Sequence, residues 1–252
     1  MSGHSKWATT KHRKGAVDAK RSKLFSKLSR IITVAAKTGG DPKPENNASL
    51  AAAIVKAKGY SLPKDKIQAA IDKAFSASAG ANYEEVIYEG YGSGGTAIYV
   101  EALTDNRNRT AADVRAAFTR AGGSLGATGS VAFQFERRGE IVIDKAGAPD
   151  EEELLMAVME AGGEDLEDND DEFIVVTAAN DLLSVKNALE AAGIAVQGAE
   201  WSMRALTPVA VKVDTARKVM RLIDNLEDSD DVQEVYHNME MTEELAAALD
   251  AD

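Results

Sequence analysis

The spacing of apolar residues changes at about residue 80, and this change constrains the fold more than any other feature of the chain. From Ala16 to Lys37 the apolar side chains recur every three or four positions, which is the period of an amphipathic helix. A second helix is predicted over Leu50–Lys58, closed by Gly59, and a third follows it. Residues 1–80 are therefore expected to form a small helical domain that ends in a linker of small residues.

Beyond residue 80 the chain alternates between strand and helix patterns. The segments Glu85–Gly90 and Thr96–Leu103 are rich in Val, Ile and Tyr, and the Gly and Ser residues between them predict a hairpin. Those glycines also match the spacing G-x-G-x-x-G, but a dinucleotide site needs a helix after the glycines, and here a strand follows. A helix at about Ala111–Ala121 and a strand around Val131–Phe135 come next.

Residues 139–205 predict a strand, a helix, two strands, a helix and a final strand, which is the ferredoxin-like order. These elements are expected at Glu140–Ile143, Glu151–Ala161, Asp165–Leu166, Glu172–Thr177, Leu182–Ala192 and Ile194–Met203. Three further elements are expected to complete the sheet that begins at residue 85. They are a strand at Val209–Val213, a helix at Thr215–Leu226 and a strand at Val232–His237.

The predicted fold class is thus α+β, with an N-terminal helical domain followed by two α/β domains, one of which is ferredoxin-like and inserted in the other. The expected boundaries are 1–80 for the helical domain, 81–138 with 206–252 for the discontinuous domain, and 139–205 for the insert.

Charge is divided unevenly along the chain. The net charge is −12, which would disfavour a polyanionic partner. Residues 1–30, however, hold nine Lys or Arg and one acid, Asp18, so this segment carries +8 and the remainder carries −20. This asymmetry predicts a nucleic-acid-binding arm on an acidic body.

The candidate contact residues lie in this basic segment. Four cations of the first helix step by three, four and three positions, so they form one stripe that is expected to face solvent and to meet phosphates. They are Lys20, Lys23, Lys27 and Arg30, with Arg21 beside them. Ahead of the helix, further cations surround an aromatic ring that could stack on an unpaired base. These residues are Lys6, Trp7, Lys11, His12, Arg13 and Lys14. The alternative is a solvated basic helix with Trp7 folded onto its own domain.

A second candidate site lies between a predicted strand and a predicted helix, in Asp105–Thr110. Arg107 and Arg109 beside a helix N-terminus could hold a phosphate, with Thr110 and Asp113 as a possible N-terminal cap. Capping and turn chemistry alone is the alternative. Because both arginines are expected to be exposed, replacing the pair with Ala is expected to leave stability nearly unchanged.

The composition disfavours other kinds of site. The chain has no Cys, its three His lack suitable partner ligands, and the acidic run Glu164–Glu172 lacks the central Gly of a calcium loop, so no metal site is expected. No apolar run reaches membrane length and no signal peptide is evident. We expect a cytoplasmic protein without a cofactor, a small-molecule substrate or catalytic activity, in an oligomeric state that the sequence leaves open.

Several long motifs lie in order along the chain: Gly3-His-Ser-Lys-Trp-Ala, Lys11-His-Arg-Lys, Asp18-Ala-Lys-Arg, Tyr88-Glu-Gly-Tyr-Gly, the segment 101–110 and the segment 122–133. Together they resemble the YebC/PmpR (TACO1-like) family. This resemblance implies a three-domain fold without a cofactor. It also implies a DNA-binding transcriptional regulator, which we take as the predicted function, or alternatively a translation factor that contacts the rRNA of the ribosome and relieves stalling.

One segment departs from the family pattern. Where the family carries Asn-Pro with Arg residues at the start of the second helix, this chain has Asn46-Asn47-Ala48-Ser49-Leu50-Ala51. A phosphate contact from that helix is therefore not carried over to this chain.

Overall fold

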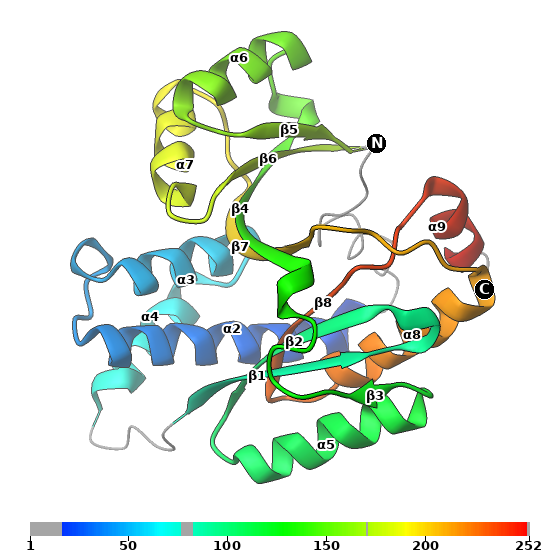
Figure 1. Cartoon of the computed structure of the whole chain (residues 1–252). Helices are drawn as coiled ribbons and strands as arrows, with labels where there is room; N and C mark the ends of the chain where they lie inside the picture. Colours follow the sequence, from blue (N-terminus) through cyan, green and yellow to red (C-terminus); the bar gives the residue numbers. More distant parts are fainter. Residues whose placement is uncertain (1–16, 77–82, 170, 251–252) are drawn as a thin grey trace. The chain divides into compact units, whose positions relative to one another are not determined.

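A computed structural model describes residues 17–76, 83–169 and 171–250, which divide into two compact units (Figure 1). Unit 1 comprises residues 17–76 and 137–202, and unit 2 comprises residues 83–136 and 203–250. Within these residues the strands form two four-stranded sheets, which follow the N-terminal helices. The predicted α+β class is thereby confirmed, whereas the boundaries of three domains stay a prediction.

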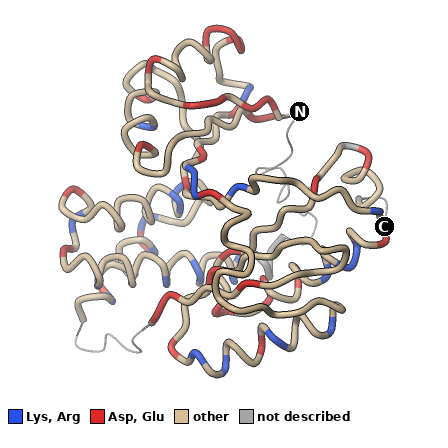
Figure 2. The backbone as a smooth tube through the Cα atoms, viewed as in Figure 1, with Lys and Arg blue, Asp and Glu red and all other residues tan. Residues whose placement is uncertain are grey.

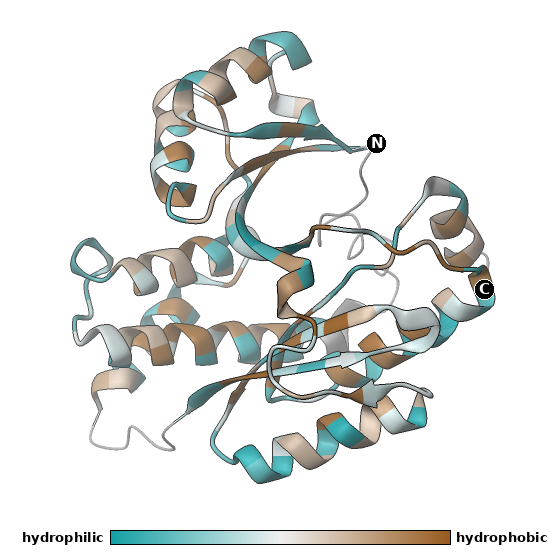
Figure 3. Ribbon diagram, viewed as in Figure 1, coloured by the Kyte–Doolittle hydropathy of each residue, from teal (hydrophilic) through white to brown (hydrophobic). Residues whose placement is uncertain are grey.

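The first part of unit 1 is a helical segment. Its elements are α2 (Val17–Gly39), the short η1 (Pro44–Asn46), α3 (Ala48–Gly59) and α4 (Lys64–Phe75). Apolar and polar residues alternate along α2 in Figure 3, and Leu28, Ile32 and Ala36, four positions apart, are buried among the side chains of α3 and α4. Burial of this stripe is what holds the three helices together.

Asn47 fixes the turn between α2 and α3. Its Oδ1 accepts a hydrogen bond from the N–H of Leu50 at 3.1 Å, which caps α3, and its amide group donates to the carbonyl oxygens of Ala35 and Asp41 at 3.0 and 3.2 Å. The segment that departs from the family pattern therefore contains a buried structural cap.

The second part of unit 1 is a sheet with two helices. Its elements are β4 (Phe135–Asp144), η4 (Lys145–Gly147), α6 (Glu151–Ala161), β5 (Asp165–Asp168), β6 (Glu172–Ala178), α7 (Leu182–Ala191) and β7 (Gly198–Ala205). The strand order is β5-β6-β4-β7, and Leu154, Val158 and Leu189 of the two helices are buried against the sheet. The helical segment joins this sheet through Glu200, whose carboxylate lies 2.7 Å from Nζ of Lys56 and accepts a hydrogen bond from the hydroxyl of Tyr60 at 3.2 Å.

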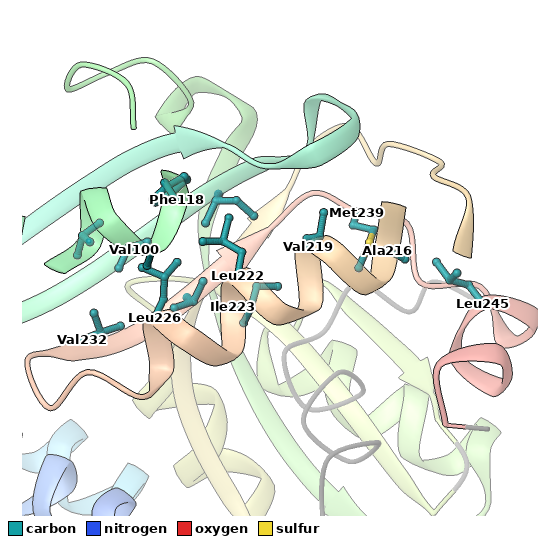
Figure 4. Packing of buried hydrophobic residues seen from close by; sticks show 14 residues of the cluster. Val100, Phe118, Ala216, Val219, Leu222, Ile223, Leu226, Val232, Met239 and Leu245 are labelled. Carbon is teal, nitrogen blue, oxygen red and sulfur yellow. The ribbon is translucent and has the colours of Figure 1, made fainter. Parts of the chain in front are cut away.

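Unit 2 is built on the other sheet. Its elements are β1 (Glu84–Tyr91), η2 (Ser93–Gly95), β2 (Ala97–Thr104), α5 (Arg107–Arg120), β3 (Ser124–Leu125), η3 (Ala132–Gln134), α8 (Val213–Glu227), β8 (Val232–His237) and α9 (Glu243–Asp250). The strand order is β3-β1-β2-β8, so β2 pairs with a strand that follows it by more than a hundred residues. Figure 4 shows Phe118 of α5 and Leu222 of α8 in the core beside Val100 of β2.

The structure corrects several predicted elements. Residues 131–134 form the short helix η3 and its entry rather than a strand. In place of the predicted strand Val209–Val213, Val209 forms an isolated bridge with Met239 and Val213 begins α8. The strand β3 and the helix α9 were not predicted. After α3 the left-handed residue is Ser61, with φ of 59°, and not Gly59.

Candidate nucleic-acid interface

Most of the predicted contact residues whose side chains the structure describes are cations of helix α2. The apolar stripe of this helix determines the direction in which they point. The stripe packs on α3 and α4, and the hydroxyl of Thr33 donates to the carbonyl of Ala70 in α4 at 2.9 Å. The remaining side of α2 is left for polar side chains. Figure 2 shows Lys and Arg residues at several positions along α2.

These cations differ in exposure. Arg21 is exposed, Lys23 and Arg30 are half-buried, and Lys27 is only 9 % exposed, so the expectation that the whole stripe faces solvent is wrong for Lys27. Lys27 stands between Leu24 and Ile31, which pack against the helical core, and its aliphatic stem is covered along with them.

Seven predicted contact residues have side chains that lie outside the described residues. Lys20 is one of them, although its backbone belongs to α2. The others are Lys6, Trp7, Lys11, His12, Arg13 and Lys14.

The ring of Phe25 draws two cations from different helices to one place. Cζ of Arg21 and Nζ of Lys66 each lie 5.4 Å from its centroid, the first on α2 and the second on α4. Lys66 was not among the predicted contact residues, although the exposed face of its helix is recognisable from the apolar spacing of Ile67, Ala70 and Ile71. The cationic surface of the helical segment therefore extends from α2 onto α4.

Arg107 and Arg109 lie in the first turn of α5 and not in a loop. The helix begins at Arg107, ahead of the predicted start, because Asn106 caps it: Oδ1 of Asn106 accepts a hydrogen bond from the N–H of Arg109 at 3.1 Å. The predicted cap, Thr110, is instead buried. Arg107 is exposed, and its Nη1 lies 3.6 Å from a carboxylate oxygen of Glu84.

Arg109 ties the start of α5 to the residue that precedes β8. Its Nη2 lies 2.8 Å from Oδ1 of Asp105 and 2.8 Å from Oδ2 of Asp231. The same Asp231 oxygen accepts hydrogen bonds from the hydroxyls of Thr110 at 2.8 Å and Thr104 at 3.2 Å. Burial alone would raise the pKa of Asp231, but the bonds from Arg109 and the two threonines outweigh it and lower that pKa. Arg109 is thus part of the hydrogen-bond network that supports unit 2. The expectation that replacing Arg107 and Arg109 with Ala leaves stability nearly unchanged did not include this network.

A buried carboxylate organises the loop before β4. Glu89 of β1 is only 3 % exposed, and its two oxygens accept the N–H groups of Gly129 at 2.6 Å, Val131 at 2.8 Å and Ala132 at 2.7 Å. Burial would raise the pKa of Glu89, but these three hydrogen bonds hold it below its ordinary value. We name residues 126–132 with this carboxylate the Glu89 clamp. The sequence contains both motifs that form it, but only the fold brings them together.

No group of three or more His, Cys, Asp or Glu side chains suited to a metal ion occurs in the described part of the chain. In the acidic run, Lys145 pairs with Asp168 and Arg138 with Glu164. His237 is engaged locally, since its Nδ1 accepts the N–H of Met239 at 3.2 Å. None of the described helices is long and apolar enough to cross a membrane.

The fold and the charges define an α+β protein in which a cationic helical segment precedes two acidic α/β sheets. Residues 5–77 match the family model described as the TACO1/YebC protein N-terminal domain, and residues 83–239 match that described as the TACO1/YebC second and third domain. The chain belongs to the TACO1/YebC family, as the sequence motifs predicted.

Similar proteins span the whole chain. A protein of Beutenbergia cavernae, named probable transcriptional regulatory protein, is 52% identical over 253 residues and covers 100% of both chains. A protein of Rubrobacter xylanophilus with the same name is 52% identical over 250 residues, or 99% of each chain. The crystal structure of a conserved hypothetical protein from Aquifex aeolicus matches 95% of this chain and 98% of that one, with a TM-score of 0.84 and 44% identity.

Proposed function

We propose that this chain is a DNA-binding regulator of transcription that works in the cytoplasm and has no catalytic activity, cofactor or small-molecule substrate. The observation that carries the proposal is the separation of charge. Residues 17–76 hold twelve Lys or Arg and five acids, whereas residues 139–205 hold three Lys or Arg and seventeen acids. The names of the relatives from Beutenbergia cavernae and Rubrobacter xylanophilus support the same role.

The proposed contacts are cations that can approach phosphates, together with one ring that can stack. They are Lys6, Trp7, Lys11, His12, Arg13, Lys14, Lys20, Arg21, Lys23, Arg30, Lys66 and Arg107. Lys27 and Arg109 are assigned supporting roles, because the first is buried and the second is held by Asp231. Phosphate contacts of this kind give affinity and orientation, while base contacts give sequence preference.

The test is a charge reversal with a matched control. The variant Arg21→Glu/Lys23→Glu/Lys66→Glu changes the helical segment, and the control Arg115→Glu/Lys218→Glu/Arg221→Glu changes exposed cations of unit 2 by the same net charge. Binding of each protein to a fluorescent DNA duplex is titrated over a range of salt concentrations. If three phosphate contacts are lost, the plot of log binding constant against log salt concentration becomes shallower by about 2.7 in the variant, while the control keeps the slope of the parent.

Two outcomes would contradict the proposal. Equal weakening in the variant and in the control would mean that only net charge matters, and an affinity that is indifferent to salt would remove the phosphate contacts altogether. Sedimentation of the chain with ribosomes that is lost in the variant but kept in the control, without measurable binding to duplex DNA, would favour the ribosomal role instead.

A further inference from the structure

The outer face of α6 carries three large apolar side chains that are exposed among the residues that the structure describes. The inner face of this eleven-residue helix contributes Leu154 and Val158, both fully buried, to the core of the sheet. On the opposite side Leu155, Met156 and Met159 are 42 %, 62 % and 56 % exposed. Positions 155, 156 and 159 are neighbours on a helix surface, so these side chains form one contiguous patch.

Helix stability accounts for the acidic residues in the first turn of α6 but not for this patch. Asp150 caps the helix by accepting the N–H of Glu153 at 2.9 Å, and Glu151, Glu152 and Glu153 lie in the first turn, where carboxylates offset the helix dipole. Leu155, Met156 and Met159 have no comparable local role, because the core is already filled from the other side. A contiguous exposed apolar patch of this kind is typical of an interaction site.

The charges around the patch select the partner. Glu152 lies one turn before Met156 and Glu160 one turn after it, so carboxylates stand at both ends of the patch. Figure 2 shows further acidic residues along β5 in the same domain. Two of the three cations in residues 139–205 pair elsewhere: Lys145 with Asp168 and Lys186 with Glu190. A surface of this charge repels nucleic acid and anionic lipid, and it attracts cationic segments.

We propose that the outer face of α6 docks a cationic amphipathic segment of a partner protein. The segment would place two or three large apolar side chains at helical spacing on Leu155, Met156 and Met159, with Lys or Arg residues opposite Glu152 and Glu160. Met side chains are flexible and polarizable, so this surface can adapt to such a segment. The site is separate from the proposed DNA contacts and does not depend on them.

The probe is a fluorescent amphipathic helix of about 15 Leu and Lys residues, with a scrambled peptide of the same composition as its reference. Fluorescence anisotropy with the full chain is expected to give an affinity for the amphipathic peptide about tenfold above that for the scrambled one, or about 1.4 kcal/mol. The variant Leu155→Ser/Met156→Ser/Met159→Ser is expected to abolish this preference. The control Phe133→Ser/Leu206→Ser, which removes exposed apolar side chains of unit 2, is expected to keep it.

A second variant, Glu152→Gln/Glu160→Gln, leaves every apolar contact in place and tests the charge selection separately. It is expected to weaken binding of the amphipathic peptide about threefold and to reduce its salt dependence. Equal loss of binding in the Phe133/Leu206 control, or unchanged binding in both α6 variants, would overturn the proposal. A self-association of the parent chain, measured by sedimentation velocity and lost in the Leu155/Met156/Met159 variant, would assign the patch to a second copy and would overturn it as well.

Discussion

Replacing Glu89 with Gln, which exchanges one carboxylate oxygen for an NH₂ group, should destabilise unit 2. The carboxylate of the Glu89 clamp accepts three backbone N–H groups at 2.6–2.8 Å in a site that is 3 % exposed. In the Gln variant the amide oxygen can still serve Val131 and Ala132, but the NH₂ group then faces the N–H of Gly129, which is donor against donor. A hydrogen bond to a charged group contributes about 1.5–3 kcal/mol, and a buried N–H left without an acceptor costs a similar amount.

We therefore expect Glu89→Gln to lower the free energy of unfolding by about 2–4 kcal/mol, which corresponds to a fall in melting temperature of unit 2 of about 10–20 °C. The matched control is Glu85→Gln, an exposed glutamate on the same strand, which should melt with the parent. Thermal unfolding followed by near-UV circular dichroism measures both variants. Amide hydrogen exchange should also speed up in residues 126–132 of Glu89→Gln.

The pH dependence gives an independent check. Because the pKa of Glu89 is lowered from 4.5 in the folded state, its contribution to stability is fully present above the unfolded pKa and is lost as pH falls through the folded pKa. The difference in stability between the parent and Glu89→Gln should therefore be constant near neutral pH and should shrink below about pH 4. A melting temperature of Glu89→Gln within a degree of the parent, or a difference that grows in acid, would refute this reasoning.

Other substitutions should separate supporting residues from exposed ones. Arg109→Ala should lower the melting temperature by a few degrees because it leaves Asp231 buried without its cation, whereas Arg107→Ala should leave it nearly unchanged; equal melting temperatures for the two would contradict the Asp231 network. Asn47→Ala removes one hydrogen-bond acceptor and two donors at the start of α3, so the free energy of unfolding measured by chemical denaturation should fall by about 2 kcal/mol. A change near zero would mean that this cap does not stabilise the helical segment. Gly90→Ala should cost about 1–3 kcal/mol, because the added Cβ would lie 2.5 Å from the carbonyl oxygen of Ser124 and 2.6 Å from the ring of Phe118, and an unchanged midpoint would mean that β1 and β3 can separate freely.

Elements with local signals at both ends could be predicted closely from the sequence. The helix Glu151–Ala161 has the predicted bounds, since Asp150 caps its start and Gly162, with φ of 90°, ends it. The strand Val232–His237 also has its predicted bounds. In both cases the alternation or period of apolar residues agrees with the local breakers, so no distant contact is needed to place the ends.

Two of the errors arose where a distant residue decides the local structure. Residues 131–134 have the composition of a strand, but the N–H groups of Val131 and Ala132 are bound by Glu89, some forty positions away in the sequence, and are unavailable to a ladder. The role of Arg109 depends on Asp231, 122 positions away. For the candidate interface, the cationic stripe of α2 could be predicted from the spacing of its residues. The burial of Lys27 could not, because it depends on how closely α2 packs against the neighbouring helices.

The pairing of β2 with β8 has a consequence for synthesis on the ribosome. After β2 has been synthesised up to Thr104, the strand edge that pairs with β8 stays unpaired until Val232–His237 is made. At about 5–20 residues per second, the intervening chain takes roughly 6–25 s to translate. During that interval Val100 and Phe118 lack Leu222 and Val235, so the nascent chain exposes an open edge and half a core. The strands β4 to β7 emerge within the same interval and can pair among themselves. A nascent chain arrested just before residue 232 should therefore be protease-sensitive between residues 83 and 136 while residues 139–205 are already protected.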